Sequence, residues 1–331
     1  MKKVLLIRLS SIGDIVLTSL AIRCLKTAYP DIQIDFLTKP QYSALVRNHL
    51  SVAHVMELDS SLWRTARRIA QEDYNYVVDL HANLRTGLLK QLLPESVKFL
   101  RYNKQSLRRN VSVWLKRDLY RGEHVPEQYL DALRPLGIKS DEKGLEFFIP
   151  EQEWIYRGDL PLTHRSGYAV LSLGATHFTK KLPLDKWMEI CSLLPLPLIL
   201  IGGKDEWKLG EELAATDELK IINKCGLYTI GQSASVVAQY KFIITQDTGM
   251  MHIAAALKKK TISIWGGTVP YLGFEPYGLG NGLSKIIEVK DLSCRPCSKY
   301  GRASCPKEHF KCMRNIRTED IINETGINLN I

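Results

Sequence analysis

Three patterns are absent from this sequence of 331 residues, and each absence narrows the class of protein. No stretch is apolar over the roughly 20 residues that a transmembrane helix needs. The glycine fingerprint G-x-G-x-x-G does not occur, which disfavours a nicotinamide-dependent oxidoreductase. No Asp-x-Asp motif occurs either, which disfavours metal-dependent binding of a diphosphate.

The amino-terminal residues resemble a signal peptide, because two lysines precede an apolar run. Arg8 and Asp14 interrupt that run before the apolar region of a signal peptide is complete. We therefore expect a cytoplasmic protein. Three isolated cysteines, at positions 24, 191 and 225, agree with this because they have the context of reduced, buried thiols.

Positive charge is in excess, with a formal net charge of +10. Such an excess indicates an anionic partner: nucleic acid, a nucleotide, a phosphorylated glycan or an acidic membrane surface. The segment from Lys98 to Arg121 is dense in basic residues and contains four aromatic ones, among them Tyr102, Trp114 and Tyr120. Such a segment usually forms a solvated face of a helix. The alternative interpretation is that it binds an anionic acceptor or acidic lipid headgroups. No nucleic-acid motif accompanies it.

Short apolar runs alternate with amphipathic helical segments along the whole chain. This alternation predicts parallel sheets built from right-handed crossovers, and hence an α/β fold. The series is interrupted from Pro150 to Gly167, a polar stretch with the composition of an interdomain connection, and restarts at Tyr168. We therefore expect two open α/β units that face each other across a cleft.

The stretch from Lys241 to Leu257 passes from an apolar, β-branched run to a helical pattern within about three residues. Asp247, Thr248 and Gly249 form the junction. A helix start offers unpaired N–H groups and the positive end of the helix dipole, and a glycine lets a phosphate approach the backbone. The alternative is that Asp247 and Thr248 only cap the helix and that His252 is a core histidine.

Asp14 follows the first strand, in the loop RLSSIGD. Open α/β sheets bind their ligands at this carboxyl edge, so Asp14 is a candidate catalytic residue. The alternative is that Asp14 merely caps the helix that follows.

Six segments follow one another along the chain: RLSSIGDIVLT, DLHANLRTG, GATHFTKKLP, IGGKDE, TQDTGMMHIAAAL and WGGTVP. Together they resemble the lipopolysaccharide heptosyltransferases of glycosyltransferase family nine. The resemblance implies the GT-B fold, with two Rossmann-like domains. It implies an acceptor-binding domain over residues 1–155, a nucleotide-sugar domain over residues 156–317, and a terminal helix within residues 318–331 that packs back on the first domain.

The resemblance also implies a role for each matching residue. Asp14 would be the general base, and Lys180 would act with the Asp247–Gly249 turn on the donor diphosphate. Lys181 is a rival for Lys180. The remaining donor-site candidates are Thr176, Glu206 and His252; for Glu206, binding of ribose hydroxyls and a simple helix cap are both open. For the acceptor, Arg85 and Arg101 are the candidates, because a guanidinium pairs with carboxylate or phosphate.

The activity implied is inverting transfer of heptose from ADP-heptose to the anionic inner core of lipopolysaccharide, with no cofactor required and with peripheral contact at the cytoplasmic face of the inner membrane. Use of another nucleotide-sugar by the same fold is the nearest alternative. A nicotinamide oxidoreductase and a non-enzymatic protein that binds membrane or nucleic acid are the others. The latter leaves Asp14 and the Asp247 junction without a role.

A cluster of cysteines lies near the carboxyl terminus, at Cys294, Cys297, Cys305 and Cys312. The first two form a C-x2-C pair, but the second such pair that would define a zinc ribbon is missing. The pattern leaves two readings open: a structural zinc site, or reduced thiols without metal. A catalytic metal is disfavoured, because a site with four cysteine ligands has no open position.

Overall fold

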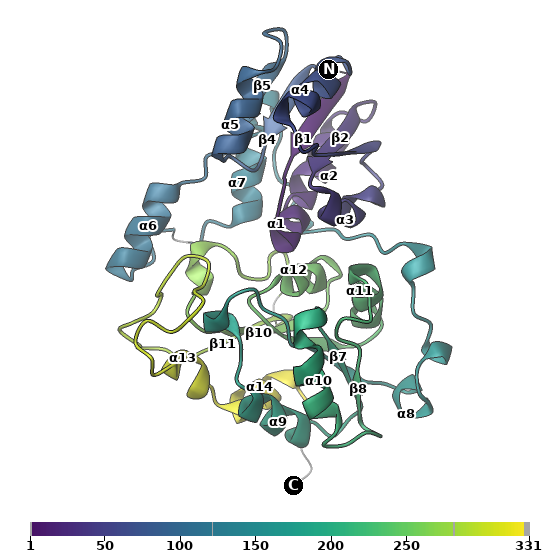
Figure 1. Cartoon of the computed structure of the whole chain (residues 1–331), viewed down its shortest axis with the longest axis vertical. Coiled ribbons are helices and arrows are strands. Elements are labelled where there is room, and N and C mark those ends of the chain that lie inside the picture. Colours follow the sequence, from purple (N-terminus) through teal and green to yellow (C-terminus); the bar gives the residue numbers. More distant parts are fainter. Residues whose placement is uncertain (1, 121, 281, 328–331) are drawn as a thin grey trace. The chain divides into compact units, whose positions relative to one another are not determined.

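The computed structural model describes residues 2–120, 122–280 and 282–327. The chain forms two compact units. The first comprises the chain up to Gln105 together with Glu123–Phe148; the second comprises Ser106–Gly122 and the chain from Ile149 onward. Each is an α/β unit around a parallel sheet (Figure 1).

The first unit is built on a parallel sheet with the strand order β3-β2-β1-β4-β5. The strands are β1 (Lys3–Ile7), β2 (Gln33–Thr38), β3 (His54–Glu57), β4 (Tyr76–Asp79) and β5 (Lys98–Arg101). The helices are α1 (Ile12–Leu17), α2 (Ser19–Ala28), α3 (Ala44–Arg47), α4 (Leu62–Ala70), α5 (Leu84–Gln91) and α7 (Val125–Asp131). Strand β1 is central and its apolar run is fully buried, as a strand covered on both faces requires.

The second unit has a parallel sheet with the order β11-β10-β9-β6-β7-β8. Its strands are β6 (Ala169–Ser172), β7 (Leu198–Ile201), β8 (Ile221–Asn223), β9 (Phe242–Gln246), β10 (Lys260–Trp265) and β11 (Ser284–Glu288). Its helices are α6 (Ser106–Leu115), α8 (Leu162–Arg165), α9 (Leu184–Leu193), α10 (Trp207–Ala214), α11 (Ile230–Ala238), α12 (Gly249–Ala256), α13 (Lys311–Arg314) and α14 (Thr318–Thr325). The predicted α/β class with two parallel sheets is confirmed.

The observed units differ from the predicted domains in the segment from Ser106 to Gly122. This segment was assigned to the first domain, but it belongs to the second unit. Arg109 is buried there, and its guanidinium lies 5.1 Å from the ring centroid of Phe274. Tyr120 is fully buried in a cluster with Val269 and Leu272. Cation–π contact and apolar burial thus attach this segment to the second unit.

The terminal helix was expected to pack on the first domain, and this expectation is wrong. Helix α14 packs against α9, β10 and β11 of the second unit. Ile321 and Ile322 enter the core of that unit, and the Thr318 hydroxyl donates to Glu189 at 2.9 Å. The amphipathic face of α14 is therefore buried within its own unit. Residues 328–331 of the predicted segment lie outside the described residues.

None of the helices in residues 2–120, 122–280 and 282–327 combines the length and apolar character that crossing a membrane would require.

Candidate active site

In both sheets the order in which strands are added reverses next to the first strand of the unit. In the second unit the strand order places β6 beside β9, and in the first it places β1 beside β4. Ligands of open α/β sheets bind at such a switch point, outside the carboxyl ends of the strands. The segments that follow β6 and β9 contain Thr176, Lys180 and the Asp247–Gly249 turn, and Glu206 follows β7. Asp14 and Arg85 lie in the first turns of the helices that follow β1 and β4.

The loop after β9 leads directly into α12, as predicted. Thr248 has an extended backbone and precedes Gly249, the first residue of this eight-residue helix. The first-turn N–H groups of α12 therefore stand at the carboxyl edge of the sheet, where they can bind an anion. His252 is buried within the same helix.

Lys180 and Asp247 form an ion pair at this junction. The Lys180 ammonium lies 2.6 Å from Asp247 Oδ2, and both side chains are largely buried. The Thr268 hydroxyl donates to the same carboxylate oxygen at 2.7 Å. Asp247 therefore fixes the position of the lysine, and its own charge is balanced by the ammonium and the hydroxyl.

Lys181 points to a different partner. Its ammonium lies 3.0 Å from Glu206 Oε1, while Glu206 Oε2 accepts the Gly203 N–H at 3.1 Å. Lys180, and not Lys181, therefore pairs with the helix junction, and its role toward the donor diphosphate stays a prediction. Glu206 makes the capping contact that was the alternative to ribose binding, and a role toward ribose stays a prediction.

Gln246 is a residue that sequence reasoning missed. It is fully buried at the end of β9. Its amide nitrogen donates to the Leu173 carbonyl, and its amide oxygen accepts the Leu182 N–H, both at 2.6 Å. Gln246 thus ties both ends of the loop that contains Thr176 and Lys180 to the central strand. A polar side chain at the end of an apolar strand was the available signal. Thr176 itself is exposed on that loop.

In the first unit, Asp14 lies in the first turn of α1 and is surrounded by donors. Arg8 lies 2.8 Å from Oδ1, and the Tyr129 hydroxyl donates to the same atom at 3.2 Å. The N–H and hydroxyl of Ser11 donate to Oδ2 at 3.2 and 2.8 Å. The contact with the Ser11 N–H is the helix-capping role considered above, so Asp14 both caps α1 and stands at the sheet's ligand edge.

These contacts determine the charge of Asp14. Burial by itself would raise the pKa of its carboxyl, but the Arg8 guanidinium and the Ser11 hydrogen bonds outweigh burial and lower the pKa to about 2. The carboxylate is therefore ionised throughout the physiological range.

The predicted acceptor residues lie on two elements next to the loop that follows β4: Arg85 is in the first turn of α5, and Arg101 is the last residue of β5. Arg101 lies 3.3 Å from the buried carboxylate of Asp79 and donates to the Asn83 carbonyl at 2.9 Å, so it holds this loop in place. Arg85 is exposed and lines a hollow of about 480 Å³ together with Lys39 and His81. Burial, with the nearby Arg8 charge, lowers the pKa of His81 to about 3, so this histidine is neutral. His81 was not among the predicted residues.

Two Rossmann-like units, each with ionic groups at its switch point, define the class of GT-B glycosyltransferases. The family model for "Glycosyltransferase family 9 (heptosyltransferase)" matches residues 62–306, and the chain belongs to this family. The predicted glycosyltransferase activity is thereby confirmed, against the oxidoreductase and non-enzymatic alternatives.

The chain resembles characterised members over nearly its whole length. It is 24% identical to lipopolysaccharide heptosyltransferase 1 of Pseudomonas aeruginosa, covering 98% of this chain and 94% of that protein. Among solved structures, E. coli ADP-heptose LPS heptosyltransferase II is 17% identical with a TM-score of 0.74, over 98% of each chain. E. coli heptosyltransferase WaaC, solved with ADP, is 19% identical with a TM-score of 0.68, over 98% of this chain and 99% of that one. The structural matches bear on the fold; the roles of individual site residues stay predictions.

Proposed function

We propose that this enzyme transfers a heptose from ADP-heptose to the inner core of lipopolysaccharide, with inversion at the anomeric carbon. The relatives named above support the substrate class. The observation that carries the proposal is the Lys180–Asp247 pair at the start of α12, since it holds a positive charge beside a helix N-terminus.

The donor's diphosphate binds at the junction of β9 and α12. The N–H groups of the first turn of α12 and the Lys180 ammonium stabilise the charge that develops on the leaving ADP. Gly249 allows the phosphates to approach the backbone closely, and the Thr248 hydroxyl adds a donor. No metal ion is needed in this scheme, because fixed cationic and dipolar groups balance the diphosphate.

The acceptor hydroxyl transfers its proton to Asp14 as the new glycosidic bond forms. Donors already surround both oxygens of Asp14, so the incoming hydroxyl replaces one of them, and the side-chain hydroxyl of Ser11 is the contact on the exposed side. Loss of that hydrogen bond makes the carboxylate more basic at the moment it accepts the proton. One displacement step then gives inversion.

The acceptor's anionic groups bind near the hollow that Arg85 and Lys39 line. Guanidinium and ammonium groups suit the phosphates or carboxylates of an inner-core glycan. Arg101 acts on the acceptor through the loop that it holds.

Nucleotide binding tests the donor site directly. ADP at about one hundred times its Kd is expected to stabilise the protein by about 2.7 kcal/mol and to raise its melting temperature by several degrees. NAD, UDP and GDP are expected to give little or no shift. Differential scanning fluorimetry measures this. An equal shift with NAD would contradict the proposal, and a larger shift with UDP or GDP would favour the same fold acting on another nucleotide-sugar.

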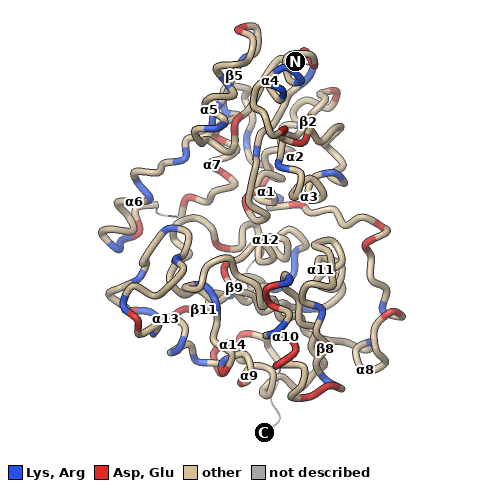
Figure 2. Tube along the Cα trace, viewed as in Figure 1, with Lys and Arg blue, Asp and Glu red and all other residues tan. Residues whose placement is uncertain are grey.

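We further propose that α6 makes the peripheral contact with the inner-membrane surface. Leu107, Val111, Trp114 and Leu115 recur at helical spacing on one face, with Leu107 82% and Trp114 79% exposed. Figure 2 shows basic residues along this segment. The sequence has Arg108, Arg109, Lys116 and Arg117 there. An exposed apolar face beside basic side chains suits the boundary between acyl chains and anionic headgroups.

A double variant in α6, Leu107→Ser with Trp114→Ser, is expected to weaken binding to vesicles that contain anionic lipid by at least about tenfold, because each large apolar side chain contributes roughly 1.5–3 kcal/mol on burial. Vesicle co-sedimentation measures this. Leu219→Ser is a matched control, since Leu219 is 77% exposed on another part of the second unit. Equal binding of the α6 variant and the control would refute the contact through α6.

A further inference from the structure

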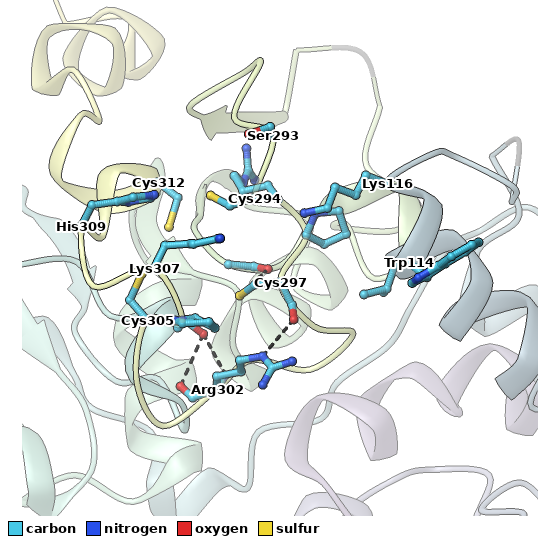
Figure 3. A pocket seen from close by; sticks show the side chains of 16 residues that line it. Trp114, Lys116, Ser293, Cys294, Cys297, Arg302, Cys305, Lys307, His309 and Cys312 are labelled. Atoms are coloured by element: carbon cyan, nitrogen blue, oxygen red, sulfur yellow. Dashed lines mark hydrogen bonds between the residues drawn. The ribbon is translucent and has the colours of Figure 1, made fainter.

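Four cysteines gather around one pocket of the second unit. Cys294, Cys297 and Cys305 lie between β11 and α13, and Cys312 lies in α13. All four line a pocket of about 490 Å³, and Figure 3 shows their sulfur atoms around the same space. We call residues 293–312 the cysteine loop.

The cysteine loop is hydrogen-bonded to the donor site from two sides. Arg302 donates its N–H to the Thr179 hydroxyl at 2.8 Å and accepts the Thr179 N–H at 3.1 Å. Cys297 donates its N–H to the Gly267 carbonyl at 2.9 Å, and Gly267 donates to the Thr179 carbonyl at 2.8 Å. Thr179 directly precedes Lys180, and Gly267 directly precedes Thr268, whose hydroxyl donates to Asp247. The cysteine loop therefore contacts the chain next to Lys180 and next to Thr268.

Gly267 is in close contact with both Cys297 and Thr179. A methyl group added at Gly267 would lie 2.8 Å from Cys297 Sγ and 2.9 Å from Thr179 Cβ. Displacement of the cysteine loop would therefore be transmitted to the two segments that hold Lys180 and Asp247.

Secondary structure does not hold the cysteine loop in place. Residues 289–310, all of which the structure describes, contain neither helix nor strand. Ordered loops longer than about 12–15 residues are uncommon without an added constraint. Its cysteines follow the spacing C-x2-C-x7-C-x6-C, which can bring four thiols to one metal ion.

The charges around the pocket suit a metal bound by thiolates. A divalent ion with four thiolate ligands carries a net negative charge, which needs cationic neighbours when partly buried. Lys116, Arg295, Arg302 and Lys307 line the same pocket. The side chain of Lys307 extends into the group of cysteines (Figure 3).

We propose that Cys294, Cys297, Cys305 and Cys312 bind one thiophilic metal ion, of the zinc type, and that this metal braces the donor site through Thr179 and Gly267. Among the described residues, no three His, Cys, Asp or Glu side chains already stand in coordinating positions. Metal binding at this cluster would therefore require the four thiols to turn toward one another and to lose their protons. The ion has a structural role, since four thiolates leave no open position for a substrate.

Metal content tests this proposal without any measurement of transfer. Full-length protein purified under reducing conditions, without added metal, is expected to contain about one zinc ion per chain by elemental analysis. Iron in place of zinc, with its visible absorbance, would support the site and change the metal. Less than about a tenth of an equivalent of either metal, or disulfide bonds among the four cysteines by mass spectrometry, would overturn the proposal.

Thiol titration provides a second measurement that needs no variant. A mercurial reagent is expected to release the metal in step with the modification of four thiols. The remaining cysteines interfere little, because Cys24, Cys191 and Cys225 do not line this pocket and are at most 3% exposed, so the reagent reaches them slowly. Metal release that is unrelated to thiol modification would refute ligation by the cluster.

Variants test the bracing role. Cys294→Ser with Cys297→Ser is expected to lose the metal and to weaken ADP binding at least about tenfold, whereas the matched control Cys24→Ser, in the other unit, retains both. Metal-depleted wild-type protein is expected to reproduce the weakened ADP binding and to recover on addition of zinc. Unchanged ADP affinity in the metal-depleted protein would refute the bracing role, while absence of ADP binding in the intact protein would instead count against the proposed function.

Discussion

Replacement of Asp14 by asparagine is expected to lower the rate of heptose transfer by at least about a hundredfold, because proton transfer to a positioned base typically contributes that much. The change keeps the shape of the side chain and removes its charge. Since Asp14 belongs to the first unit and the donor site to the second, affinity for ADP should not change. Steady-state kinetics with isothermal titration of ADP measures both quantities.

The Asp14 variant also removes the carboxylate partner of Arg8, which is largely buried. Breaking such a pair costs about 3–5 kcal/mol, so the melting temperature must be measured beside the rate. Ser11→Ala is the matched control: it removes one donor to the carboxylate and leaves the charge in place. The control should stay within about tenfold of the wild-type rate. A folded Asp14→Asn protein with wild-type turnover would remove Asp14 from the mechanism.

The low pKa of Asp14 determines how its contributions to the transfer rate and to stability change with pH. Because the pKa is lowered to about 2 in the folded protein, the carboxylate is fully ionised above pH 5, and Asp14 contributes no acidic limb to the rate there. Its contribution to stability is present above the unfolded value, near 4, and is lost as the pH falls toward about 2.

Lys180→Ala is expected to lower the transfer rate by about 10²–10³-fold and to abolish most of the stabilisation by ADP, because it removes the fixed cation that balances the leaving diphosphate. Lys181→Ala is the matched control, since Lys181 pairs with Glu206 instead. It should change the rate by less than about tenfold. Equal losses in the two variants would mean that general positive charge, and not the placement of Lys180, supports the reaction.

The sequence was sufficient to predict the buried strands, because buried parallel strands are continuous apolar runs, but it did not predict the edge strands β5 and β11, most of whose residues are not buried. Strand β9 is an example of such a run, with every residue buried. The same pattern identified the turn from β9 into α12, since Asp247, Thr248 and Gly249 break the run at a helix start. Asp14 could be placed at the carboxyl edge of β1 for a similar local reason.

Partners that are distant in the sequence could not be predicted. Thr268 binds Asp247 and Gln246 binds Leu182 because the sheet brings their strands and loops together, and nothing in the local sequence indicates these pairs. The attachment of α6 and α14 to the second unit depends on tertiary burial, which periodicity alone does not reveal. The sequence around Arg109 predicts a surface charge, but its side chain is buried against the ring of Phe274.

The central claim is that this chain uses Lys180 and the α12 turn to release ADP while Asp14 activates an inner-core hydroxyl. Mass spectrometry of truncated lipopolysaccharide acceptors, incubated with the enzyme and a panel of nucleotide-sugars, tests it most directly. The account predicts that ADP-heptose alone gives an acceptor heavier by one heptose residue, with inverted anomeric configuration and an equal amount of ADP. Retained configuration, transfer from a different nucleotide-sugar in preference to ADP-heptose, or release of ADP without a glycosylated acceptor would contradict it.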